Sequence, residues 1–290
     1  MDSNIIPSTV TKVVSDVSSK PLASFGELIS LWLFGKSIGK CQAQKQIATE
    51  KELAKWEAEK PWFQKAQEQK FIREYSNLGS VLVQAQPLLN SDSNKIENDN
   101  DLFYGLLEHA KNISNSEMQQ LIAKIIAGEY NNPGSYSMST LHSIKMLGKE
   151  ELELFERISS LVINYDSIPK IIFTLPENAK DFMGELKIDF GSLQILQNLG
   201  LFLPNDMTSS LANPLKQIFA LQYFEKKILF KPTHENNFSV KMPEFYALSI
   251  TGKQIIKHLN PKYNERYFSW LKENYIIPNF KVIEENKTHE

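Results

Sequence analysis

The stretch MQQLIAKIIAGEYNNPGSYSMSTLHSIKMLGKEELELF, residues 118–155, decides the fold of this chain. Its first part repeats apolar residues at the spacing of one helix face. Pro133 then cannot continue the helical hydrogen-bond ladder, and Gly134 is free to adopt a left-handed turn. Ser137 is a suitable N-cap for the next helix, which Gly148 ends before another begins. The stretch therefore predicts consecutive helices joined by short turns.

The helical pattern extends upstream of this stretch to Leu102. Ser114 and Glu117 match a capping box, in which each side chain satisfies a free backbone donor at the start of a helix. We expect the last of these helices to continue to Ile163. Residues 102–164 are therefore the predicted helical core.

The N-terminal part, residues 1–90, reads as an apolar segment followed by a helical stalk. Ala, Gln, Glu and Lys, which favour helices, dominate residues 40–86. Pro61 should interrupt them, so we expect a second helix to open at Trp62. Residues 91–101, SDSNKIENDND, are acidic and lack apolar periodicity, which predicts a linker.

The most apolar segment runs from Leu22 to Ile38 and carries Glu27 and Lys36. As a helix it would extend about 25 Å, less than the roughly 30 Å of a bilayer core. Over residues 22–34 it is apolar almost all round, so it needs either protein burial or the membrane interface. Both destinations stay open. The predicted membrane or partner contacts are Leu28, Leu31, Trp32 and Phe34.

Residues 165–280 have the mixed pattern of a small α+β domain. A short apolar run over residues 170–175 predicts a strand, and residues 219–230 predict a hairpin. Residues 281–290 are polar, and we expect them to form a frayed tail. The predicted fold class is therefore mostly α, with a helical stalk, a helical core and this C-terminal domain.

Composition argues against several classes of function. Hydrophobic residues make up 42%, charged residues 23%, and the net charge is -2, as in ordinary soluble proteins. The single Cys41 excludes an internal disulfide and a multi-thiolate zinc site. Residues 1–20 do not resemble a secretory signal. We expect a cytoplasmic protein, with peripheral association at the inner membrane as the alternative.

Catalytic motifs are equally scarce. The sequence has no HExxH and no Cys-x-x-Cys pattern, and its Gly-Lys-Ser at residues 35–37 lacks the first glycine of a phosphate loop. Glu150, Glu151 and Glu153 fall in the first turn of a predicted helix, where negative charge complements the dipole. We therefore expect no enzyme, and we assign no catalytic residue, cofactor, metal ligand or small-molecule substrate.

A set of landmarks around residues 118–155 resembles a bacterial family of unknown function. The landmarks are Ala127, Gly128, Glu129, Pro133, Gly134, Ser135, Tyr136, Ser137, Thr140, Leu141, Leu147 and Phe155. Two positions depart from the family pattern, with Ile122 in place of a tryptophan and Ser139 in place of an arginine. The layout is also similar to the abortive-infection alpha group, which implies a role in defence against phage.

The C-terminal part resembles a winged helix. A helix leads through Gly200 into a strand, and residues 245–259, FYALSITGKQIIKHL, lead from a strand into another helix. Such domains often bind DNA. The exposed positions predicted for the recognition helix are Ser192, Gln194, Gln197 and Asn198, without arginine or lysine, so protein contact is favoured over nucleic acid.

These observations predict a non-enzymatic protein that binds a protein partner or itself. The leading hypothesis, implied by the family resemblance, is a membrane-associated or partner-responsive antiphage effector. The alternative is a DNA-binding regulator that uses the winged-helix-like domain.

Overall fold

The computed structural model describes residues 61–90, 101–165, 168–171, 180–204, 210–212, 218–232, 239–241 and 245–287. The chain divides into two compact units, residues 1–137 and 138–290. The predicted contact segment Leu22–Phe34 and residues 91–100 of the predicted linker lie outside the described residues. Within the described part, no helix is both long and apolar enough to cross a membrane.

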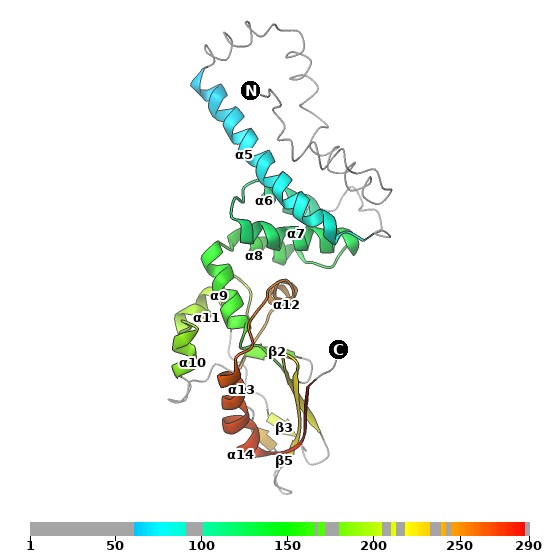
Figure 1. Cartoon of the computed structure of the whole chain (residues 1–290), viewed down its shortest axis with the longest axis vertical. Helices are drawn as coiled ribbons and strands as arrows, with labels where there is room; N and C mark the ends of the chain where they lie inside the picture. The colour runs from blue at the N-terminus through cyan, green and yellow to red at the C-terminus, as the bar shows by residue number, and fades with distance from the viewer. Residues whose placement is uncertain are drawn as a thin grey trace. The chain divides into compact units, whose positions relative to one another are not determined.

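The described part of the first unit is helical (Figure 1). Helix α5 (Trp62–Ala85) begins directly after Pro61, as predicted, and a 3-10 turn η1 (Gln86–Leu88) follows it. Helices α6 (Asp101–Ala110) and α7 (Ser116–Asn131) pack against α5 and against each other. Their shared core is formed by Leu78, Val81, Leu82, Phe103, Leu106, Leu107, Leu121, Ile122, Ile125 and Ile126.

The predicted capping box of α7 is wrong by one residue. The cap is Asn115, whose side chain accepts the backbone N–H of Met118 at 3.0 Å. The Ser114 hydroxyl accepts a hydrogen bond from the Asn77 amide at 3.2 Å instead. A contact between α5 and the loop before α7 therefore engages the residue that the sequence predicted as the cap.

The second unit begins with α8 (Met138–Met146) and α9 (Lys149–Ser159). Helix α9 was predicted to reach Ile163, but it ends four residues earlier. The Ser160 hydroxyl donates to the carbonyl of Arg157 at 2.6 Å, and residues 160–162 form turns. Ile163 then begins the first strand, so this segment pairs in the sheet and does not continue the helix.

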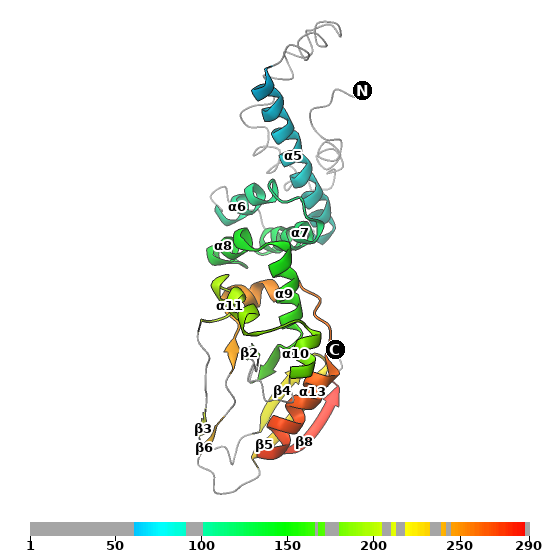
Figure 2. The ribbon, with the colours of Figure 1, turned by 90° about the vertical axis from the view of Figure 1, so that its left-hand side faces the viewer.

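A six-stranded antiparallel sheet forms the centre of the second unit (Figure 2). Its order is β7-β2-β1-β4-β5-β8. The strands are β1 (Ile163–Tyr165), β2 (Ile168–Ile171), β4 (Phe219–Tyr223), β5 (Lys226–Pro232), β7 (Tyr246–Ala247) and β8 (Phe280–Lys287). The predicted hairpin over residues 219–230 is confirmed as β4 and β5. Two short strands, β3 (Ser210–Ala212) and β6 (Ser239–Lys241), form a separate pair.

The predicted frayed tail is wrong over residues 281–287. These residues belong to β8, which pairs along the whole of β5. Phe280 is buried at the start of the strand and contacts the rings of Phe219 and Phe230. This burial anchors a polar segment that has little tendency to order by itself.

Short helices complete the second unit. Helix α13 (Glu265–Leu271) continues into a π-helical turn η4 (Lys272–Ile276) and α14 (Ile277–Asn279). Tyr267 and Phe268 of α13 contact the ring of Tyr223 in β4, which places α13 against one face of the sheet (Figure 2). The remaining helices are α10 (Lys180–Glu185), α11 (Phe190–Asn198) and α12 (Ile250–Ile256). The chain is thus helix-rich with a C-terminal antiparallel sheet.

Candidate functional site

The turn after α7 brings four of the predicted landmark residues together. Glu129 is buried, and its carboxylate accepts the backbone N–H of Gly134 at 2.8 Å and that of Tyr136 at 3.2 Å. Gly134 adopts a φ of +84°, as its predicted left-handed turn requires. The tyrosine ring lies over Gly128, where a Cβ atom would meet the Tyr136 hydroxyl at 2.6 Å.

The other landmarks have separate places. Pro133 and Ser135 are exposed in the turn, where the Ser135 hydroxyl donates to the carbonyl of Asn132 at 2.6 Å. Ser137 directly precedes α8. Burial raises the pKa of the Tyr136 hydroxyl to about 12, and the nearby Glu129 carboxylate adds to this shift. The landmark residues therefore stabilise this turn. Their hydrogen bonds and packing give each of them a structural role.

Helices α8 and α12 contact each other through polar side chains, of which Thr140 and Thr251 are buried. Thr140, a fully buried landmark residue, donates its hydroxyl to the side-chain oxygen of Gln254. Ser139 accepts a longer hydrogen bond from Thr251, at 3.4 Å. Ser139, at a position where the family resemblance implies an arginine, is thus a contact point between two helices.

The start of α12 is joined closely to the end of α11. The Ser249 hydroxyl caps α12 by accepting the Gly252 N–H and donates to the carbonyl of Gly200 at 2.5 Å. Gly200 has a φ of +72°, which lets the chain turn into the residues that pair with Leu248. A Cβ atom on Gly252 would lie 2.0 Å from the carbonyl oxygen of Leu201. Only glycine fits this approach of two backbone segments.

The exposed face of α11 differs in part from the predicted one. Gln194 and Asn198 are exposed, but Ser192 bonds Asp189 at the N-cap and Gln197 donates to the carbonyl of Leu203 at 2.9 Å. Ile195 takes a place on this face instead, with 45% of its surface exposed. Sequence reasoning missed Ile195 because an apolar residue in a short helix is normally assigned to the core.

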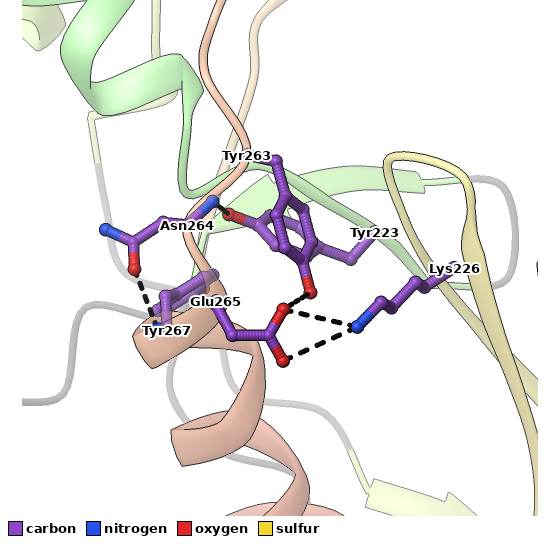
Figure 3. A network of polar contacts seen from close by, with 6 residues as sticks. All are labelled: Tyr223, Lys226, Tyr263, Asn264, Glu265 and Tyr267. Atoms are coloured by element: carbon purple, nitrogen blue, oxygen red, sulfur yellow. Dashed lines mark hydrogen bonds and ion pairs between the residues drawn. The ribbon is translucent and has the colours of Figure 1, made fainter.

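A polar network near the β4–β5 turn was also missed (Figure 3). The buried Tyr223 hydroxyl donates to the carbonyl of Ser160 at 2.5 Å and accepts the Asn264 N–H at 3.1 Å. Beside it, Glu265 accepts the Tyr263 hydroxyl at 2.6 Å and pairs with Lys226 at 3.3 Å. The hydrogen bond from Tyr263, with the Lys226 ammonium, lowers the pKa of the Glu265 carboxyl.

This network ties the start of α13 to the strands. The Lys226 ammonium lies 4.7 Å from the centre of the Phe268 ring and 5.1 Å from that of Tyr263. The residues come from segments distant in sequence, so no motif could have revealed the cluster. Each of these polar side chains forms a hydrogen bond or ion pair with another residue of the network or with the backbone. This arrangement holds α13 against the strands.

A family model described as a protein of unknown function, DUF2806, matches residues 63–272. The chain belongs to the DUF2806 family. Neither the curated proteins nor the solved structures contain a match. The predicted membership in a family of unknown function is confirmed, and the match covers the landmark turn, α11 and α12. The finer similarity to the abortive-infection alpha group stays a prediction.

The described part of this DUF2806 protein brings together no group of three or more His, Cys, Asp or Glu residues that could hold a metal ion. Glu151, from the acidic cluster considered above, accepts the backbone N–H of Gly148 at 3.1 Å at the start of α9. Glu151 lies in the first turn of α9, as predicted, and this bond makes it part of a capping box.

Proposed function

We propose that this DUF2806 protein is a non-enzymatic effector that acts by binding a partner protein. The observation that supports the proposal is the exposed face of α11. It presents Ile195 between Gln194 and Asn198, and the helix contains no lysine or arginine. An apolar side chain flanked by amides suits a protein surface, and the helix lacks the cationic groups that supply most of the affinity for a phosphate backbone.

The biological setting of the proposal comes from the family resemblance. The similarity to the abortive-infection alpha group supports an antiphage effector that responds to a protein made or altered during infection. The test compares plaque formation on cells with and without the gene. Equal plaque numbers across a broad panel of phages would remove the antiphage role.

A pair of substitutions on α11 tests the partner surface. Ile195→Ser should abolish protection against phage while the thermal unfolding midpoint changes little, because the side chain is already half exposed. Gln194→Ser is the matched control on the same face and should retain protection. Full protection by the Ile195 variant would show that α11 is not the contact surface.

Association with the inner membrane is the second part of the proposal. The segment Leu22–Phe34 carries Trp32 for the headgroup region and has Lys20, Lys36 and Lys40 nearby for anionic lipid. The double substitution Leu31→Glu with Trp32→Glu should release the protein from anionic vesicles in a flotation assay. Wild-type protein that stays in the soluble fraction would remove this part of the proposal.

A DNA-binding regulator is the second candidate. Its support is the order of elements, in which α11 leads through Gly200 to Phe202, and Phe202 pairs with Leu248 before α12. Titration of the full chain against random and genomic duplexes separates the candidates. We expect weak binding without sequence preference, and a selective complex below roughly 10⁻⁷ M at physiological salt would favour the regulator.

A further inference from the structure

The strands β4, β5 and β8 have one open face, opposite the face that contacts α13. Along β5, Ile228 and Phe230 are buried, whereas Lys227 and Lys231 on the other face are exposed, with the half-buried Leu229 between these two lysines. The strand register extends this open face to both neighbours. Gln222 lies opposite Lys227 on β4, and Lys281 lies opposite Lys231 on β8.

The pairing of Lys231 with Lys281 is electrostatically unfavourable. Like charges directly opposite each other on neighbouring strands destabilise a sheet. Neither ammonium group forms an ion pair with any residue that the structure describes. The acidic residue on the same face of β8 is Glu284, which lies opposite Leu229 and not opposite either lysine. This end of the face therefore has an excess of positive charge.

Two exposed isoleucines accompany the two lysines. Ile218 immediately precedes Phe219, which pairs with Phe230, so Ile218 lies beside Lys231 and is 64% exposed. Ile283 is the extra residue of a bulge, because Leu229 pairs with Glu284 and Phe230 with Val282. It is 46% exposed. Ile218, Lys231, Lys281 and Ile283 together are called the lysine–isoleucine face below.

We propose that the lysine–isoleucine face binds the surface of a bilayer that contains anionic lipid. Its lysines complement the negative headgroups, and its exposed isoleucines can enter the boundary between headgroups and acyl chains. Nucleic acid fits this face less well. The described part of the open face exposes no aromatic ring for stacking on bases, and a phosphate backbone offers isoleucine no apolar partner.

This inference goes beyond the proposed partner surface on α11 and uses none of its residues. It also uses no residue of Leu22–Phe34, so the two membrane contacts can fail independently. A protein that binds lipid at both places gains avidity, because the second contact forms at a high effective concentration.

The test measures partition of the full chain onto vesicles of phosphatidylcholine mixed with phosphatidylglycerol. Lys231→Gln with Lys281→Gln should weaken partition about thirtyfold, since each lysine near an anionic surface contributes a factor of about five. Ile218→Ser with Ile283→Ser should weaken it as well. Both variants should stay folded, because all four side chains are exposed. Binding to vesicles of phosphatidylcholine alone should be weak for every variant.

Lys65→Gln with Lys145→Gln is the charge-matched control, because both lysines are exposed and neither belongs to a strand of the sheet. An equal loss in this control would mean that only net charge matters, and it would overturn the proposal. Unchanged partition of the Lys231 and Lys281 variant would do the same. If the Lys231 and Lys281 variant binds vesicles like the wild type and the Leu31 and Trp32 variant does not, the proposed membrane role is retained. The lysine–isoleucine face is then excluded as the contact. Loss of single-stranded DNA binding in place of vesicle binding would reassign the face to nucleic acid.

Discussion

The carboxylate of Glu129 holds the backbone of Tyr136, seven residues further along the chain, through a hydrogen bond of 3.2 Å. Its other oxygen accepts the N–H of Gly134 at 2.8 Å. One buried side chain at the end of α7 thus organises the whole turn that follows. This relationship explains why Gly-Glu in the last turn of a helix precedes the Pro-Gly-Ser-Tyr sequence.

Replacement of Glu129 by Gln should destabilise the first unit. The amide has one acceptor oxygen for two backbone N–H groups, and its NH2 group would face a donor in a buried site. We expect a loss of about 1 to 3 kcal/mol in the free energy of unfolding, measured with urea. Glu150→Gln, at an exposed helix start, is the control and should change stability little. A similar loss in both variants would contradict the role of the turn.

Gly134→Val should destabilise through backbone strain alone. No atom lies within 4 Å of the position of an added Cβ, so the side chain has room, but the φ of +84° disfavours a β-branched residue. The expected cost is about 1 to 2 kcal/mol. Gly134→Asn should cost less, because asparagine tolerates positive φ better. Equal costs in urea titrations of the two variants would show that strain is not the cause.

Alkaline pH should weaken the fold through Tyr136. Its pKa is raised from 10.0 to about 12, mainly by burial, so the folded state retains its proton where the unfolded state has lost it. The stabilisation is complete below pH 10 and is lost as the pH rises toward 12. Tyr136→Phe should reduce the slope of unfolding free energy against pH in this range. Burial also raises the pKa of Tyr223, so part of the slope should remain in the Tyr136 variant. A slope that is unchanged by the Phe substitution would count against the assignment.

Tyr223→Phe should loosen the joint between the sheet and α13. The substitution leaves the buried carbonyl of Ser160 and the N–H of Asn264 without their shared partner. We expect a loss of about 2 to 3 kcal/mol in unfolding free energy. Tyr263→Phe removes an exposed hydrogen bond to Glu265 and should cost less than about 1 kcal/mol. A larger loss of unfolding free energy for Tyr263→Phe than for Tyr223→Phe would mean that the exposed part of the network holds α13 to the sheet.

Gly252→Ala should be among the most damaging single-atom changes in the second unit. The new methyl group would lie 2.0 Å from the backbone oxygen of Leu201, which cannot move aside like the end of a flexible side chain. A cost of about 3 kcal/mol or more is expected. Gly184→Ala, where no atom lies within 4 Å, is the control and should be neutral or stabilising within α10. Hydrogen exchange at α12 would locate the damage.

The candidate surfaces were only partly predictable. The landmark turn could be anticipated because its glycine, proline and serine act on their own backbone. Ile195 could not, since its exposure depends on which face of α11 meets the rest of the unit. The lysine–isoleucine face was equally hidden, because the register of β5 against β8 places Lys231 opposite Lys281.

The sequence by itself determined the helices whose ends are set by local backbone chemistry. Pro61 starts α5, and Gly148 separates α8 from α9, because proline and glycine constrain the chain whatever surrounds them. Only the tertiary structure decided the cap of α7, the early end of α9 and the ordering of β8. In each case a contact with a segment distant in sequence outweighs the local preference. Asn77 bonds the Ser114 hydroxyl, Asn164 and Tyr165 pair with β4, and β5 pairs with the polar C-terminal strand.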